Sequence, residues 1–385
     1  MNFLKTEILF VDFVLDNQAA DVHALITTVE NGGGGDQYQL IFYGQKMYKG
    51  KTDTLRFVTS ADATEFEERS MLSHYIKLGI LPYINKSAQA GEITIGYKPK
   101  EQTKQEIKSG GASEDRWNYW VYRVGINGNI NGDAVYNTTN FNGNLSANRT
   151  TDELKISFSV RAGKNKSTYE FDTPTGTTKI ETDNDFYRFY HQLVKSINIH
   201  WSYGYDLGLS KSTFSNDKFT ALFKPAVEYN FFPYSEVNNR FFTVRYGVDV
   251  RRNEYIDTTL FDKKQETLFG HGLSSNLSYN QKWGTTSVGF SYHNYLHNWQ
   301  YFNIGLNAQV DVRIAGGLSF YMYAFGGIVR DQLSLPKGEA TEQEILTRRR
   351  QLASGYNFYT SFGLSYRFGS KVNNFVNPRF TGGND

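Results

Sequence analysis

The stretch 300–314, QYFNIGLNAQVDVRI, alternates strictly between apolar and polar positions. From Phe302 to Ile314 its even positions are all apolar, whereas its odd positions include Asp311, Arg313 and several amides. Successive side chains on a β-strand point to opposite faces, so one face of this segment meets an apolar environment and the other meets water. Such alternation over about ten residues is typical of the strands of an outer-membrane barrel.

The same alternation recurs from Trp117 to Phe368, interrupted by turn residues. We predict about twelve strands, with the region 166–195 being the least regular. The expected strands cover 117–130, 135–149, 153–165, 167–172 continuing with 177–195, 197–211, 218–232, 240–253, 266–281, 285–297, 300–314, 317–330 and 355–368.

This pattern predicts a mainly β protein, an antiparallel transmembrane β-barrel of about 12 strands preceded by a small α+β domain. An even number of strands lets the first and last strands pair antiparallel. A soluble sandwich also has alternating strands. Strand lengths near 14, several charges on the polar face, and aromatic residues near strand ends (Trp120, Trp283, Trp299 and Tyr301) favour the membrane.

Residues 1–97 follow a different pattern, typical of a small α+β domain. The helix expected over 60–80 is capped by Asp62 or Thr64 and ended by Gly79 and Pro82. The glycine-rich NGGGGD (31–36) joins two strands as a hairpin and lacks the Lys-Ser/Thr of a phosphate loop. The expected strands cover 6–14, 21–29, 37–44, 53–58 and 92–97.

The domain order is then 1–97, a polar linker over 98–115, a barrel over 116–369 and a tail over 370–385. Several turns are short, whereas 331–355 is a long loop with a surface helix expected over 339–353. Short turns face the periplasm in outer-membrane barrels. We therefore expect an outer-membrane protein whose N-terminal domain and tail lie in the periplasm.

Composition narrows the function. The chain of 385 residues has no cysteine, a net charge of +2 and a mean hydropathy of −0.52. Disulfides and thiolate metal sites are excluded, and the balanced charge is not that of a nucleic-acid-binding protein. No apolar run approaches the roughly 20 residues of a spanning helix. No signal peptide is visible after Met1, so we expect either the mature chain behind a start Met or a trimmed form of the protein.

The polar strand faces predict the lining of the barrel. Lumen-lining charges on this parity are eight cations and four acids: Arg123, Lys155, Arg161, Lys224, Arg245, Arg251, Arg313 and Arg367, with Asp206, Glu228, Asp249 and Asp311. Centring a turn in 234–240 places Glu228 opposite Arg245 and Lys224 opposite Asp249. These charges either hold a nearly closed interior together or, through the excess of cations, line a narrow pore that prefers anions.

Residues that could carry catalysis are sparse. His293 and His297 lie four apart on one strand, about 13 Å, which is too far to share a metal. Ser291 and His293 have the serine–histidine spacing of barrel phospholipases, but no neighbouring Asn or calcium-binding set supports this reading. We predict no enzymatic activity and no cofactor.

Three segments carry a family resemblance: DFVLDNQAADVHALITT (12–28), VEYNFFPYSE (227–236) and SFGLSYRFGSKVNNFVNPRF (361–380). They resemble an uncharacterised family of Gram-negative outer-membrane proteins with a small N-terminal domain before a barrel. The resemblance implies topology only. TSFGLSYRFGS (360–370) also resembles the C-terminal signal of clients of the outer-membrane assembly machinery, and the N-terminal domain is loosely similar to the periplasmic domain of the Tol-system propeller protein.

Two functions are left open by the sequence. One is a narrow or gated porin-like channel with a cation-rich lumen. The other is a closed barrel that anchors residues 1–97 for a periplasmic protein partner. In both, the expected partners are outer-membrane lipid and the assembly machinery, and no nucleic acid.

Overall fold

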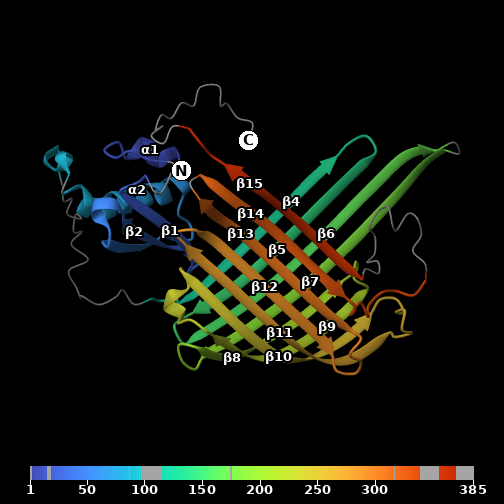
Figure 1. Ribbon diagram of the computed structural model, residues 1–385. Coiled ribbons are helices and arrows are strands. Elements are labelled where there is room, and N and C mark those ends of the chain that lie inside the picture. Colours follow the sequence, from blue (N-terminus) through green and yellow to red (C-terminus); the bar gives the residue numbers. More distant parts are fainter. Residues whose placement is uncertain are drawn as a thin grey trace.

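The computed structural model describes residues 2–14, 19–85, 87–92, 94, 96, 115–173, 176–315, 317–338 and 355–369. A small N-terminal domain lies against one end of a large rolled sheet (Figure 1). The expected tail (370–385), the surface helix (339–353) and, except for Asp115, the linker (98–115) lie outside the described residues.

The N-terminal domain is a three-stranded antiparallel sheet, in the order β1-β2-β3, with helices on one face. The expected hairpin around NGGGGD is confirmed, and Thr64 caps α2 through a capping box with Glu67. The core between helices and sheet includes Leu40, Phe42 and Ile76. The elements are α1 (Asn2–Glu7), β1 (Val22–Glu30), β2 (Asp36–Gly44), η1 (Lys46–Tyr48), β3 (Thr52–Val58), α2 (Glu65–Ile84) and η2 (Ala88–Glu92).

Three predictions for this domain are wrong. The chain over 2–7 is helix α1, which with the following residue buries Leu4 and Ile8 in the core, rather than a strand over 6–14. In 92–97, Glu92 belongs to η2, and Thr94 and Gly96 are not in a strand.

Helix α2 also continues through Pro82 to Ile84 instead of ending there. A proline inside a helix costs about 3 kcal/mol because it removes one backbone hydrogen bond and crowds the preceding turn. Burial of Tyr83, whose hydroxyl donates to the Phe42 carbonyl at 2.9 Å, offsets this cost.

Twelve antiparallel strands form the large sheet, and each pairs with its neighbours in sequence, which confirms the expected number. The region 166–195 differs from expectation, because β6 and β7 are long and continuous across it. The strands are β4 (Trp120–Gly132), β5 (Tyr136–Thr150), β6 (Leu154–Thr173), β7 (Gly176–Ser196), β8 (Trp201–Ser212), β9 (Asp217–Asn230), β10 (Arg240–Tyr255), β11 (Gln265–Gln281), β12 (Gly284–Tyr295), β13 (Phe302–Ala315), β14 (Leu318–Val329) and β15 (Tyr356–Tyr366).

The sheet rolls up so that β4 to β6 lie behind β13 to β15 in the view of Figure 1. It does not close within the described residues, because β4 pairs only with β5 and β15 only with β14. The expected barrel is therefore an open, rolled sheet in this structure. In the part of the chain that is described, no helix is both long and apolar enough to cross a membrane.

Solvent exposure along β10 separates the two faces of the sheet. Tyr246 and Val248 are 46% and 48% exposed, whereas Gly247, Asp249 and Asn253 are buried. The apolar side chains therefore lie on the outer face, and the polar ones on what we call the inner face. Because residues paired across a ladder point to the same side, the registers carry this assignment from β10 to every other strand.

Candidate functional site

All the sequence-predicted lining residues that lie in strands share the inner face. The ladders give this parity to Arg123, Lys155, Arg161, Asp206, Lys224, Glu228, Arg245, Asp249, Arg251, Asp311 and Arg313. Arg367 follows β15, and its backbone N–H donates to the Gly317 carbonyl at 2.9 Å. That this face lines a water-filled lumen stays a prediction.

The expected register of β9 and β10 is confirmed, but the ion pairs are different. Arg245 lies opposite Glu228, yet its guanidinium pairs with Asp206 on β8 at 2.5 Å. Asp249 pairs with Nε2 of His293 on β12 at 3.0 Å, rather than with Lys224. Both pairs skip one strand, because the curvature of the sheet brings side chains of alternate strands together on the inner face.

Asp206 is buried and is the centre of a polar cluster. Its carboxylate accepts hydrogen bonds from the Tyr190 hydroxyl at 2.6 Å and from Gln192 Nε2 at 2.9 Å, in addition to the contact with Arg245. Sequence reasoning missed Tyr190 and Gln192, although the alternation over 186–194 could have placed them on the inner face. We name Asp206, Tyr190, Gln192 and Arg245 the Asp206 cluster.

Asp249 and His293 form a second buried pair, between β10 and β12. The Asp249 side chain is 1% exposed. The intervening strand has glycine at the crossing, and a Cβ added at Gly270 would lie 2.6 Å from His293 Nε2 and 3.0 Å from Asp249 Oδ2. His293 is therefore held by a carboxylate. Ser291 shares its face, but no hydrogen bond joins its hydroxyl to the imidazole among the described contacts.

The inner face thus has a charged sector, which we define as the inner faces of β6 to β12. The remaining strands, β4, β5, β13, β14 and β15, form what we call the seam sector. On the inner face of the seam sector the described charged side chains are Arg123, Asp311 and Arg313, each within four residues of a strand end. Between these ends the seam sector carries neutral amides, namely Asn127, Asn129, Asn140, Asn142, Asn144, Asn307 and Gln309.

Four aromatic side chains on the inner face of the seam sector are exposed. Tyr321, Tyr323, Phe325 and Tyr359 are 48%, 47%, 41% and 50% exposed. The Phe325 and Tyr359 rings stack with centroids 5.6 Å apart, and Tyr323 lies 6.2 Å from each of them. We name these four residues the aromatic strip. The inward orientation of these residues could not be predicted from the sequence, because β14 has apolar residues on both faces.

The N-terminal domain contacts the end of the sheet that carries the turns 151–153, 197–200, 231–239 and 282–283, which we call the short-turn mouth. Gln39 Nε2 donates to Asn239 Oδ1 at 2.9 Å, and Lys282 Nζ lies 3.4 Å from the centre of the Tyr43 ring. These side chains come from the face of the small sheet opposite α2.

The glycine-rich hairpin tip reaches the same mouth at β4 and β5. A Cβ added at Gly32 would come within 2.5 Å of the Thr150 side chain. At Gly34, where φ is +78°, it would lie 2.6 Å from an Arg123 guanidinium nitrogen. Only glycine fits here, because the backbone approaches closely and, at Gly34, is left-handed. The contacts are therefore spread over β4, β5 and two further turns.

The electrostatics of His23 on β1 agree with this placement. Burial is the main cause that lowers the pKa of His23, followed by the cations Arg313 and Lys282. Both cations belong to the short-turn mouth. The small sheet therefore presents a neutral imidazole to a cationic rim.

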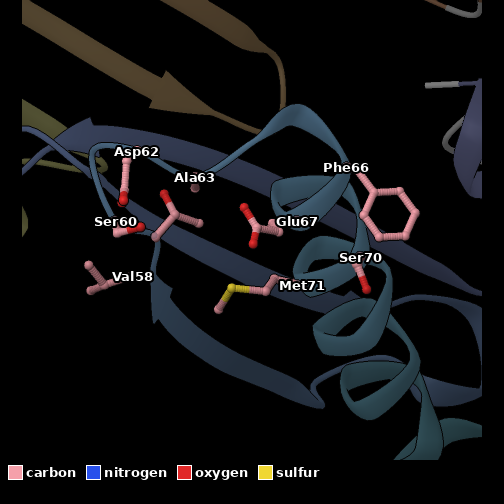
Figure 2. A pocket seen from close by; sticks show the side chains of 9 residues that line it. Val58, Ser60, Asp62, Ala63, Phe66, Glu67, Ser70 and Met71 are labelled. Atoms are coloured by element: carbon pink, nitrogen blue, oxygen red, sulfur yellow. The ribbon is translucent and has the colours of Figure 1, made fainter.

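A pocket of about 400 Å³ lies on the N-terminal domain where β3 leads into α2. Figure 2 shows Val58 and Met71 beside Asp62 and Glu67 in this pocket. Phe66 also lines it and is 80% exposed. The pocket thus combines apolar surface with carboxylates. Among the described residues no group of three His, Asp or Glu could hold a metal ion.

No protein-family model matches this chain, and no curated protein matches it. Among solved structures, the NanC porin in a rhombohedral crystal form matches with a TM-score of 0.30 and 10% sequence identity. The match covers 64% of this chain and 99% of that porin. So slight a likeness leaves the architecture to be established by the strand ladders themselves.

Proposed function

We propose that this protein is an outer-membrane β-barrel channel, narrowed inside by its charged sector and covered at its short-turn mouth by the N-terminal domain. The observation that carries the proposal is the separation of faces over twelve strands, with apolar side chains outside and polar ones inside. A lipid-facing exterior with a polar interior is what a membrane barrel requires.

The height of the apolar outer band supports the membrane assignment. On the outer face of β7 the charged residues Asp185 and Lys195 bound a stretch of Tyr187, Phe189, His191 and Leu193, which holds no acid, lysine or arginine. Ten residues at about 3.3 Å each, tilted by about 40°, give a band of roughly 25 Å. Beyond Asp185 the outer face carries ion pairs, such as Lys164 with Asp183 at 2.8 Å, so this part of the hairpin stands outside the lipid.

A membrane barrel also needs closed edges, because unpaired backbone groups in hydrocarbon cost several kcal/mol each. We propose that β4 and β15, the free edges of this structure, pair antiparallel in the membrane. Amide hydrogen exchange in lipid nanodiscs tests this pairing, since the amides of both strands should be as protected as those of β10. Fast exchange along both edges would contradict closure.

The seam sector is the proposed path for solute. The central inner side chains of β13 and β14 are exposed, whereas those of β10 and β11 in the charged sector are mostly buried or partly buried. The cations at the short-turn mouth, Arg123, Lys155 and Arg313, lie near the ends of their strands and favour the entry of anions. In this proposal the N-terminal domain lies in the periplasm, and it must shift for current to flow.

A covalent lock tests channel and cover together. The chain contains no cysteine, so Gln39→Cys with Asn239→Cys supplies a single thiol pair at positions whose native side chains meet across the two domains. Because cysteine is shorter than glutamine and asparagine, a short bis-methanethiosulfonate cross-linker is used to bridge the two thiols. In planar bilayers with a KCl gradient, the reduced protein should show anion-biased openings, and cross-linking should abolish them until a reductant is added. Each single-cysteine variant is the control.

The outcomes separate the two parts of the proposal. Unchanged current through protein that a gel shows to be cross-linked would overturn the covering role of the domain. Absence of current in folded, reduced protein at every voltage would overturn the channel.

A second function, anchoring a periplasmic partner through the N-terminal domain, is favoured by the pocket, where the exposed Val58 and Phe66 lie with Met71 beside carboxylates. An exposed apolar patch with a polar rim is typical of a protein interaction surface. In this alternative, Phe66→Ala should reduce recovery of a cross-linked envelope partner and leave the current unchanged. Equal recovery of the partner by the parent and by the Phe66→Ala variant would contradict the anchoring function.

A further inference from the structure

The inner face of β14 departs from the rest of the sheet. On β10 the inner face carries polar side chains and the outer face carries apolar ones. On β14 the three central inner positions are Tyr321, Tyr323 and Phe325, all exposed. An aromatic side chain left in water forgoes roughly 1.5–3 kcal/mol of burial, so this placement calls for a reason other than stability.

Each of the three inner aromatic residues of β14 lies directly opposite a polar residue of β13. Asp311 faces Tyr321, Gln309 faces Tyr323 and Asn307 faces Phe325. Directly opposed side chains have their Cβ atoms about 5 Å apart, so a ligand on an aromatic ring lies within reach of the neighbouring amide or carboxylate. The amides offer both hydrogen-bond donors and acceptors.

This alternation matches the chemistry of a sugar. A pyranose ring has an apolar C–H face that packs on an aromatic ring, and a rim of hydroxyls that both donate and accept hydrogen bonds. Tyrosine and phenylalanine present flat apolar surface, and Asn307 and Gln309 can bind the rim. From Tyr321 to Phe325 the strip spans about 13 Å, longer than a single sugar ring.

The charge of the side chains on the inner face of the seam sector distinguishes between a neutral and an ionic ligand. Among the described inner residues of the seam sector, Asn127, Asn129, Asn140, Asn142 and Asn144 are neutral, and charges occur only toward the strand ends. A charged ligand would have to give up water at mid-depth without a counter-ion, at a cost of several kcal/mol. A neutral, hydroxyl-rich ligand avoids this cost.

We propose that the aromatic strip, with Asn307 and Gln309, binds a neutral oligosaccharide on the inner face of the seam sector. This assignment rests on the proposed channel, of which it names the solute class. The ligand runs along β14 with its rings on Tyr323, Phe325 and Tyr359 and its hydroxyls toward β13.

Calorimetry on the folded, detergent-purified full chain tests the site without relying on current. The probes are maltohexaose, cellohexaose and xylohexaose, with hexagalacturonate as an anionic comparison. We expect binding of at least one neutral probe, weakened about fivefold by Tyr323→Ala, Phe325→Ala or Tyr359→Ala singly. Phe290→Ala removes a comparably exposed ring from the outer face and is the matched control, with unchanged affinity expected.

Three results would overturn the assignment: no binding of any neutral probe, equal binding by the strip variants, or tighter binding of hexagalacturonate. Heat-modifiable migration on gels shows that each variant is folded. The same probes added to planar bilayers should block the current. Calorimetric binding without any current would overturn the channel and leave the saccharide site in place.

Discussion

Strands β10 and β14 use their inner faces in two different ways. On β10 the inner side chains are buried, and they form ion pairs across the curvature to Asp206 on β8 and to His293 on β12. On β14 the inner face is free of charge, and its three central side chains are aromatic and exposed. Alternation therefore tells which residues face inward, whereas the size and charge of those residues decide whether a sector fills the interior or leaves it open.

The largest loss of stability is expected from a substitution at the centre of the charged sector. Asp206→Ala removes the acceptor of Tyr190, Gln192 and Arg245 and leaves a partly buried guanidinium unpaired. Breaking a buried ion pair in this way costs about 3–5 kcal/mol. Urea unfolding in detergent, followed by tryptophan fluorescence, measures the loss.

The matched control is Asp311→Ala in the seam sector, where the carboxylate is on an exposed residue. Its effect should stay within about 0.5 kcal/mol. Equal losses for the two aspartates would remove the distinction between the sectors.

A slightly smaller loss of stability is expected from a charge placed on the outer face. Val248 lies near the middle of β10 and is exposed on the face that we assign to lipid. An arginine at the bilayer midplane costs about 2–4 kcal/mol. Refolding of Val248→Arg into lipid vesicles should be destabilised by this amount. Gln309→Arg, on the exposed inner face of β13, should fold like the parent. If Gln309→Arg were destabilised and Val248→Arg were not, the assignment of the inner and outer faces would be wrong.

Gly270→Ala tests how tightly the charged sector is filled. The added methyl group would lie 2.6 Å from His293 Nε2 and 3.0 Å from Asp249 Oδ2, so the pair must move apart. Overpacking of this kind costs about 1–3 kcal/mol. Gly143→Ala on β5 has nothing within 4 Å of the added carbon and should be nearly neutral. A neutral Gly270→Ala in the same unfolding assay would mean that the interior is loosely filled.

The smallest effect concerns the contact of the N-terminal domain with the mouth. Burial and the cations Arg313 and Lys282 lower the pKa of His23, so the neutral imidazole is favoured while the domain is in place. The contact is then at full strength above about pH 6.5, the ordinary pKa of histidine, and weakens as the pH falls through the lowered value.

Current through the full chain should therefore rise on acidification across this window, and His23→Gln should flatten the response. A current that falls with acidification in the parent, or an unchanged response in the variant, would contradict this role of His23.

Much of the fold could be predicted from the sequence, because period-two alternation is local and strong. The strand number and the register of Glu228 opposite Arg245 were both predictable. The long β6–β7 hairpin was not, since Lys164 and Lys166 place charge on the outer face beyond the apolar band and blur the alternation. The short apolar run near Leu4 fits a helix or a strand equally well.

The site was harder to predict, because it depends on curvature and on contacts between distant segments. Arg245 pairs with Asp206 only because alternate strands approach on the concave face. The contact of Gln39 with Asn239 joins two residues that are 200 apart in sequence, one in each domain. The aromatic strip was hidden because Phe320 and Tyr321 are both apolar, so parity alone could not place either of them.

The most direct test of the two-sector account is the accessibility of single cysteines in this cysteine-free chain. Gln309→Cys lies on the exposed inner face of β13, and Asn253→Cys lies on the buried inner face of β10, two residues from the end of its strand. A charged methanethiosulfonate reagent, added to protein in planar bilayers, should modify position 309 quickly and block the current. Position 253 should react slowly and leave the current intact. Fast reaction with block at 253, and protection at 309, would contradict the account.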